Sequence, residues 1–254
     1  MKSKVLNYPK QRKHTYHFLD YAKEFSPVYL SIEVDFNNIQ QARERIFIES
    51  ATKISYITFI IKSISQVLKK YPKANAAVKG AFFPKIAFYE DVIAKFTLDK
   101  TIDDERIVLS GKVLNGDTKS LEMIQSDIDH YKNSAFQEVE EFKSIHKLHS
   151  LPTWLGNILY KKNVDNLEKR HNIQGTFTVT SLGHKPIKHF YPITSSTLCF
   201  GIGSIEEQPK VIKDRVEIRP ILPICLTFDH RAIDGALAAD ILTEIKTHLE
   251  NWGN

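Results

Sequence analysis

Cysteine, glycine and proline are all scarce in this sequence of 254 residues, which contains 2 Cys, 10 Gly and 10 Pro. So few cysteines cannot build a disulfide framework, and so little glycine and proline excludes collagen-like and low-complexity chains. Both cysteines, Cys199 and Cys225, lie within apolar runs, where buried and reduced thiols are expected. The sequence therefore predicts a globular protein of a reducing compartment, and we expect a cytoplasmic location.

Long hydrophobic runs are also absent. The most apolar window, residues 54–64, is interrupted by Lys62, and the polar N-terminal region has no stretch of signal-peptide length. Basic residues exceed acidic residues by 35 − 30 = 5, but they are spread along the chain. We therefore expect no membrane and no nucleic acid among the partners, whereas a small anionic ligand would suit the charge.

Common phosphate-binding and metal-binding motifs are missing as well. No glycine-rich loop of the P-loop or Rossmann type occurs in the sequence. His146 and His149 have helical spacing, but no set of acidic or cysteine ligands accompanies them. This pattern favours a solvated helix face over a zinc site, and we expect no metal.

Strand-like and helix-like patterns alternate after a polar, basic stretch at the start of the chain. We expect residues 1–14 to form a loose arm or an exposed first turn, and residues 15–254 to form one α/β domain, because no linker or repeat divides them. The expected strands cover residues 27–36, 82–89, 91–98, 106–114, 175–181, 197–205, 211–218 and 221–228, and the expected helices cover about 37–52, 56–70, 118–149, 155–170 and 236–249.

The junction between the expected strand at 221–228 and the final helix carries the most informative pattern. A period of two places His230 on the same strand face as Leu226 and Phe228, just where the strand ends. An imidazole at this position is partly desolvated, which disfavours its charged form and keeps it neutral near pH 7. It could then accept a proton from a thiol or a hydroxyl group.

Asp234 and Gly235 follow at the start of the final helix. The aspartate either caps that helix or is a charged partner that fixes the loop, and the glycine would let the backbone approach another group closely. An isolated His-x-x-x-Asp more often marks a satisfied core histidine and a helix cap. The residues around it favour a catalytic interpretation instead.

Two motifs make the sequence similar to a known family. Arg219-Pro220, an apolar strand and then Asp-His-Arg-Ala-Ile-Asp-Gly-Ala at 229–236 resemble the signature of the catalytic domain of dihydrolipoyl acyltransferases. These are core subunits of 2-oxo acid dehydrogenase complexes and relatives of chloramphenicol acetyltransferase. Gly-Thr-Phe-Thr-Val-Thr-Ser-Leu-Gly at 175–183 is similar to the Gly-Thr-Phe-Thr-Ile-Ser-Ser-Leu-Gly of that family. Weaker similarity extends over residues 15–250.

The resemblance implies an α/β fold of the chloramphenicol acetyltransferase type, a mixed sheet with helices packed on one face. It also implies a homotrimer with active sites at the subunit interfaces. The implied reaction is acyl transfer between a thioester and a thiol, with coenzyme A or acyl-coenzyme A as a substrate. The acceptor would be a lipoyl group on another carrier protein or a small thiol, amine or hydroxyl compound.

The resemblance also assigns roles to individual residues. His230 matches the general base of the family, and Asp234 matches an aspartate that mainly supports the structure of the site. Thr180 falls at the position of a serine whose hydroxyl group donates to the tetrahedral oxyanion, from the neighbouring subunit. Ser181 is the alternative donor. Thr180 could instead be a residue that is present only because threonine favours β-strands. The residues assigned to coenzyme A binding are Ser181, Arg231 and Gly235.

Three features depart from the family pattern. The chain shows no lipoyl domain, so we expect no covalent lipoyl group on it, although Asp99-Lys100 resembles a lipoylation sequence. Residues 185–188 replace glycines beside the expected oxyanion site, and residues 104–112 replace a loop of the pocket wall. The polar residues 249–254 lack the apolar tail with which trimers form cages, so they predict a free trimer.

Two other functions remain alternatives. One is an O-acyltransferase of small hydroxyl compounds, like chloramphenicol acetyltransferase. The other is a scaffold subunit that kept the fold and lost turnover. A peptide-synthesis condensation domain fits less well, because it requires two such lobes and usually a second histidine where this chain has Asp229.

Overall fold

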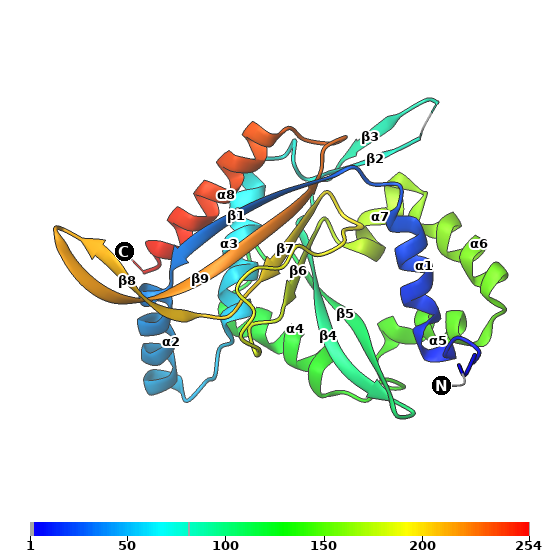
Figure 1. The fold of residues 1–254 in the computed structure, drawn as a ribbon, viewed down its shortest axis with the longest axis horizontal. Helices are drawn as coiled ribbons and strands as arrows, with labels where there is room; N and C mark the ends of the chain where they lie inside the picture. Colours follow the sequence, from blue (N-terminus) through cyan, green and yellow to red (C-terminus); the bar gives the residue numbers. More distant parts are fainter. Residues whose placement is uncertain (1–2, 81, 254) are drawn as a thin grey trace.

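The computed structural model describes residues 3–80 and 82–253, so the ends of the expected arm and domain, at residues 1–2 and 254, lie outside it. Within these residues, seven strands form one mixed sheet in the order β1-β9-β7-β6-β4-β5, and β8 pairs with β9 (Figure 1). Strands β4, β6 and β7 run parallel, and the other pairs are antiparallel. The strands are β1 (Pro27–Asp35), β4 (Ile93–Ile102), β5 (Glu105–Leu114), β6 (Phe177–Ser181), β7 (Leu198–Ile202), β8 (Glu206–Ile212) and β9 (Arg215–Asp229).

One layer of helices covers one face of this sheet and forms the main core with it. Alternate residues of the strands, such as Phe96, Phe200 and Leu226, are buried against helix residues such as Ile61 and Ile241. Each fully buried side chain of this size contributes about 1.5–3 kcal/mol. The expected mixed sheet with a helical layer is therefore confirmed. The helices of the layer are α2 (Asn37–Ser50), α3 (Tyr56–Lys70), α4 (Leu121–Asn133) and α8 (Gly235–Glu250).

A second group of helices packs at one side of the sheet, at the right in Figure 1. Within it, α1 contacts α5 and α6, and α7 contacts α6, β4 and a small hairpin. Phe18 of α1 lies over the Lys95 ammonium group, on the opposite face of β4 from the main core. These elements are α1 (Lys13–Ala22), α5 (Lys143–Ser150), α6 (Thr153–Val164), α7 (Leu167–Gln174) and the hairpin of β2 (Ala76–Lys79) and β3 (Lys85–Phe88).

Two expected helices are interrupted. The single helix predicted over 118–149 is α4, the short 3-10 helix η2 (Glu140–Phe142) and α5. The break occurs because Phe136, Val139 and Phe142 turn inward and are buried. The helix predicted over 155–170 is α6 and α7, and the side chain of Asn166 caps α7 by accepting two backbone N–H bonds.

Two further segments differ from expectation in part. Residues 10–14, predicted within the loose arm, lie in the 3-10 helix η1 (Lys10–Arg12) and at the start of α1. The strands predicted at 211–218 and 221–228 are the hairpin of β8 and an uninterrupted β9. The turn of this hairpin places Lys213 and Asp214 at positive φ angles of 47° and 65°.

Among the described helices, none combines the length and apolar composition that a bilayer crossing requires. The cytoplasmic location stays a prediction.

A buried lysine lies on the second face of the sheet. Lys95 is 8% exposed, and its ammonium group donates to the side-chain oxygens of Gln174 (2.7 Å) and Ser195 (3.2 Å). Its hydrogen-bond acceptors are uncharged, so burial dominates and lowers the pKa of Lys95 to about 8. The folded state therefore releases this proton more easily than the unfolded chain does.

This difference predicts a rise in stability at alkaline pH. Between the folded pKa and the ordinary lysine value of about 10.4, the unfolded chain binds more protons, so folding becomes more favourable as pH rises. Urea unfolding at pH 7, 8, 9 and 10 should show that Lys95→Met is more stable than the wild type at pH 7 and lacks this rise. Lys147→Met, at an exposed position, should behave like the wild type. Parallel pH profiles for wild type and Lys95→Met would contradict the account.

Candidate active site

His230 occupies the turn between the longest strand and the last helix. The strand β9 ends at Asp229, α8 begins at Gly235, and the backbone N–H of His230 donates to the carbonyl oxygen of Ser26 (2.9 Å). The ring centroids of His230 and Phe228 lie 5.8 Å apart, and the His230 side chain is 45% exposed. The imidazole is therefore held through its backbone at the end of the sheet, with one side open in the single chain.

Asp234 is positioned as a partner of that histidine. It occupies the N-cap position of α8, but within the described residues its side chain makes no capping hydrogen bond. One carboxylate oxygen lies 3.6 Å from His230 Nδ1, and the side chain is 88% exposed. This distance suits an ion pair with a protonated imidazole and exceeds a normal hydrogen bond. Asp234 therefore occupies the N-cap position without a capping bond, and its role at the site stays a prediction.

Gly235 does not make the close backbone approach that the sequence suggested. A Cβ atom built at this position would have no other heavy atom of the described chain within 4 Å. The predicted role of Gly235 in coenzyme A binding stays a prediction, and the open space is available to another molecule.

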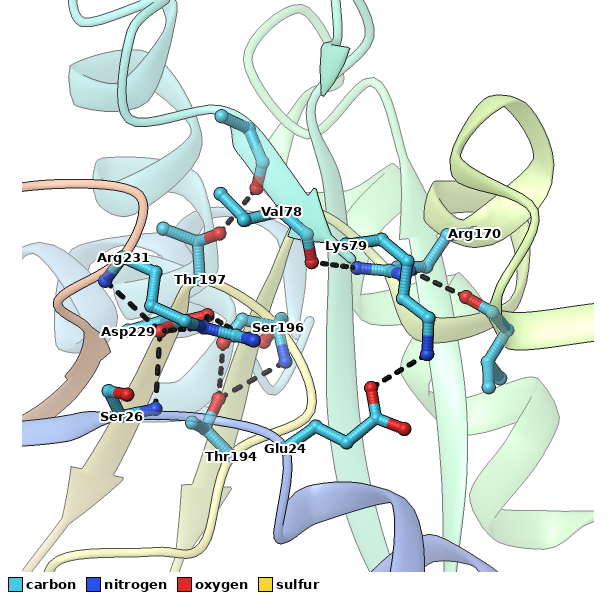
Figure 2. A network of polar contacts seen from close by, with 12 residues as sticks. Glu24, Ser26, Val78, Lys79, Arg170, Thr194, Ser196, Thr197, Asp229 and Arg231 are labelled. Atoms are coloured by element: carbon cyan, nitrogen blue, oxygen red, sulfur yellow. Dashed lines mark hydrogen bonds and ion pairs between the residues drawn. The ribbon is translucent and has the colours of Figure 1, made fainter. Parts of the chain in front are cut away.

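Asp229, whose role the sequence analysis missed, fixes the residues on both sides of His230. Its carboxylate is 1% exposed and accepts hydrogen bonds from the guanidinium group of Arg231 (2.7–3.1 Å) and from the backbone N–H groups of Arg231 and Ser26 (Figure 2). The guanidinium group also lies over the ring of Phe25. Because Arg231 is committed to Asp229, its predicted contact with coenzyme A stays a prediction.

A wider polar network surrounds this ion pair (Figure 2). The backbone N–H of Asp229 donates to the carbonyl oxygen of Thr197 (2.9 Å). Nearby, Lys79 of β2 pairs with Glu24, which follows α1, and Arg170 of α7 donates to a carbonyl oxygen of β2. Segments from different parts of the chain are thus joined by buried or half-buried polar contacts.

The ion pair predicts a large effect of Asp229→Ala on stability. The change would leave the partly buried guanidinium group of Arg231 and the N–H of Ser26 without their acceptor, at a cost of about 2–3 kcal/mol. Urea unfolding should report this loss. Asp99→Ala, which removes the exposed partner of Arg106, is the matched control and should cost less than about 1 kcal/mol. Equal costs for both variants would refute the assigned role of Asp229.

Thr180 lies on the second face of the sheet, away from the main core. Its neighbours Phe177 and Val179 belong to the main core, so alternation along β6 directs Thr180 to the opposite face. Its hydroxyl oxygen accepts a hydrogen bond from the hydroxyl group of Thr97 on β4 (2.7 Å). Ser181 points to the other face and accepts from the backbone of its own turn. Thr180 is therefore better placed than Ser181 to act on this face.

Strand register separates Thr180 from His230 within one chain. Thr180 pairs with Gly201 of β7, and Gly201 pairs with Cys225 of β9. His230 follows Cys225 by 230 − 225 = 5 residues, which is about 16 Å along a strand. A single chain therefore does not bring these two side chains together.

The loop before β7 covers part of the second face beside Thr180. A side chain at Gly201 would clash with the carbonyl oxygen of Phe190, which explains the need for glycine there. The altered residues 185–188 belong to this loop, and Lys188 pairs with Glu206 (3.1 Å). The altered residues 104–112 lie in the regular hairpin of β4 and β5.

The pair that resembles a lipoylation sequence lies within a strand. Asp99 and Lys100 belong to β4, where Asp99 accepts hydrogen bonds from Arg106 and the ammonium group of Lys100 donates to the carbonyl oxygen of Ser134. Both side chains are thus engaged with other parts of the chain.

The histidine pair at 146 and 149 packs against α1. His149 Nε2 lies 3.0 Å from His14 Nδ1, and Phe136 stacks beside both His146 and His149. Burial, followed by the charge of His14, lowers the pKa of His149 to about 4. Across residues 3–80 and 82–253, no group of three or more His, Cys, Asp or Glu side chains is arranged to hold a metal ion.

Two surface hollows of the chain lie elsewhere. One, of about 220 Å³, is lined by Phe136 and His146 among others, and one of about 350 Å³ is lined by Lys210 and Arg219 among others. Neither of these two hollows includes His230 or Thr180. These two hollows are therefore separate from the candidate catalytic side chains.

The sheet order and the helical layer define an α/β fold of the chloramphenicol acetyltransferase class. The chain superposes on a chloramphenicol acetyltransferase structure with a TM-score of 0.50, at 11% identity, covering 98% of this chain and 100% of the other. A family model for the 2-oxoacid dehydrogenases acyltransferase (catalytic domain) matches residues 2–140 and 157–254. The chain belongs to this family, as the two sequence motifs indicated.

Two relatives illustrate the similarity. The dihydrolipoyllysine-residue acetyltransferase component of the pyruvate dehydrogenase complex from Rickettsia prowazekii is 30% identical over 230 residues, covering 88% of this chain and 48% of that protein. A probable dihydrolipoamide acetyltransferase structure from Listeria monocytogenes has a TM-score of 0.72 at 20% identity, with 100% of this chain and 97% of the other covered. The chain spans about half the length of the curated relatives it matches.

Proposed function

We propose that this chain transfers an acyl group between coenzyme A and a thiol acceptor, with His230 as the general base. The observation that carries the proposal is the position of His230. Its backbone is fixed at the end of β9 by Ser26, its neighbour Asp229 is locked to Arg231, and its ring stays accessible. A rigid backbone with an accessible imidazole is what proton transfer to and from a substrate requires.

The chemistry follows from the two side chains and from the thioester. His230 takes the proton of the attacking thiol, and the thiolate adds to the thioester carbonyl carbon. Asp234, 3.6 Å from Nδ1, favours the imidazolium ion that forms. Thr180 donates its hydroxyl hydrogen to the tetrahedral oxyanion. When the intermediate collapses, the departing thiolate recovers the proton from His230. A positioned base contributes about 10²–10⁴ in rate, and one oxyanion donor about 10²–10³.

A complete site of this kind requires two chains. Thr180 and His230 lie on different strands and are offset by five residues of register. We infer that the chain forms a homotrimer, in which Thr180 of one subunit faces His230 of the next. A neighbouring subunit would also exclude water from the His230 ring and from the exposed Asp234 carboxylate, which strengthens their interaction.

The dihydrolipoyl group of another protein is the acceptor we favour, because the family match includes both motifs and the Rickettsia relative is named for that residue.

Acyl-coenzyme A consumption and free coenzyme A should be followed by chromatography, with dihydrolipoamide or a small hydroxyl compound as acceptor. Turnover with dihydrolipoamide supports the proposal. Turnover only with the hydroxyl compound would favour O-acyl transfer, and no turnover with either acceptor would favour a scaffold role.

His230→Ala should reduce acyl transfer by at least about 10²-fold, because it removes the proposed base. Activity should be measured with acetyl-coenzyme A and dihydrolipoamide at matched protein concentrations. His130→Ala, at an exposed position of α4, is the matched control and should keep wild-type activity. A His230→Ala protein with near wild-type kcat would reject His230 as the base.

Thr180→Val should reduce kcat more than about tenfold, because it removes the oxyanion donor and keeps a β-branched side chain of similar size. Thr180→Ser restores the hydroxyl group and should recover most of the activity. Ser181→Ala, on the other face of β6, should have a smaller effect than Thr180→Val. The reverse order for Thr180→Val and Ser181→Ala would transfer the donor role to Ser181.

A further inference from the structure

Thr180 is bonded to a second threonine on the neighbouring strand. Strands β4 and β6 run parallel, and the register that pairs Phe96 with Val179 places Thr97 directly beside Thr180 on the second face. The Thr97 hydroxyl group donates to the Thr180 hydroxyl oxygen at 2.7 Å. The two side chains lie 83 residues apart in the sequence, so their contact depends on this long-range pairing.

The direction of this hydrogen bond matters for the chemistry. A threonine hydroxyl group has one hydrogen to donate and two lone pairs that accept. Because Thr180 accepts from Thr97, one lone pair of its oxygen is occupied on the side of β4. Its own hydrogen is not used in this bond and is available to another acceptor. Polarisation by the accepted bond also makes Thr180 a stronger donor.

The surroundings of Thr97 hold it in place. It lies in the middle of β4, where it also pairs with Ser110 of β5 across the other side of the strand. Gly201, the β7 neighbour of Thr180, contributes no side chain on that flank. Thr97 is therefore the strand neighbour whose side chain can orient the Thr180 hydroxyl group.

We propose that Thr97 is a positioning residue that orients the Thr180 hydroxyl group toward the oxyanion. This inference rests on the proposed acyl transfer and deepens it. It gives Thr97 no contact with the substrate, so its effect should appear in kcat and leave the KM for acyl-coenzyme A almost unchanged. A merely structural cross-strand pair would instead lower stability and leave the kcat of the folded protein unchanged.

The test is a double-mutant cycle of Thr97→Val and Thr180→Val, with kcat and KM measured for dihydrolipoamide acylation. Thr97→Val keeps the β-branched shape and removes the donor. It should lower kcat about threefold to tenfold, the equivalent of one neutral hydrogen bond, and change KM less than about twofold. Thr97→Ser should recover most of kcat. In the Thr180→Val background, Thr97→Val should have no further effect, because the hydroxyl group that it is proposed to orient has been removed.

The outcomes separate this inference from the proposed function. Wild-type kcat in Thr97→Val, or an equal loss of kcat in both backgrounds, would overturn the positioning role while acyl transfer stands. A kcat for Thr97→Ser as low as that for Thr97→Val would also overturn it. Thr101→Val, at an exposed position of the same strand, is the matched control and should keep wild-type kcat. If the wild-type protein transfers no acyl group to any acceptor, the proposed function fails and this inference fails with it.

Discussion

The buried carboxylate of Asp229 is the constraint on which the candidate site depends. A charge removed from water is tolerated only where partners compensate for it, and Arg231 and the N–H of Ser26 supply that compensation. Satisfying Asp229 fixes where β9 ends and how the chain turns into α8. His230 is the residue inside that turn. Its orientation therefore depends more on the burial of its neighbour than on contacts of its own ring.

The fold holds the candidate catalytic groups in two separate places. His230 and Asp234 lie where β9 meets α8, and Thr180 and Thr97 lie on the second face farther along the strands. The main core holds both places rigidly, because the same strands contribute alternate side chains to it. A single chain does not bring His230 and Thr180 together. The proposed chemistry therefore requires that subunits assemble. The exposed ring of His230 and the exposed Asp234 carboxylate fit that requirement.

Local patterns in the sequence were sufficient for much of the fold. The part of β9 that leads to His230, residues 221–228, the buried helix α3 and the final helix follow from local sequence patterns. The break between α4 and α5 does not, because it depends on Phe136 and Phe142 turning into the core. The continuous β9 was also missed, since Arg219-Pro220 looks like a boundary in the sequence.

The candidate site was predictable to a similar degree. The spacing of His230 and Asp234 placed them at one turn, and the family motif pointed to Thr180. Asp229 looked like an ordinary motif position, and its burial is visible only when Ser26 is brought beside it. The bond between Thr97 and Thr180 depends on the parallel pairing of two distant strands, which periodicity does not specify.

The central claim, that the site combines His230 of one chain with Thr180 of another, is tested most directly by subunit complementation. His230→Ala and Thr180→Val chains should be inactive or nearly so when each is assembled alone. In trimers co-assembled from equal amounts of both, about a quarter of the interfaces should combine an intact His230 with an intact Thr180. The account predicts that about this fraction of wild-type activity returns. If the co-assembled trimers are no more active than the separate variants, the two residues do not form a shared site.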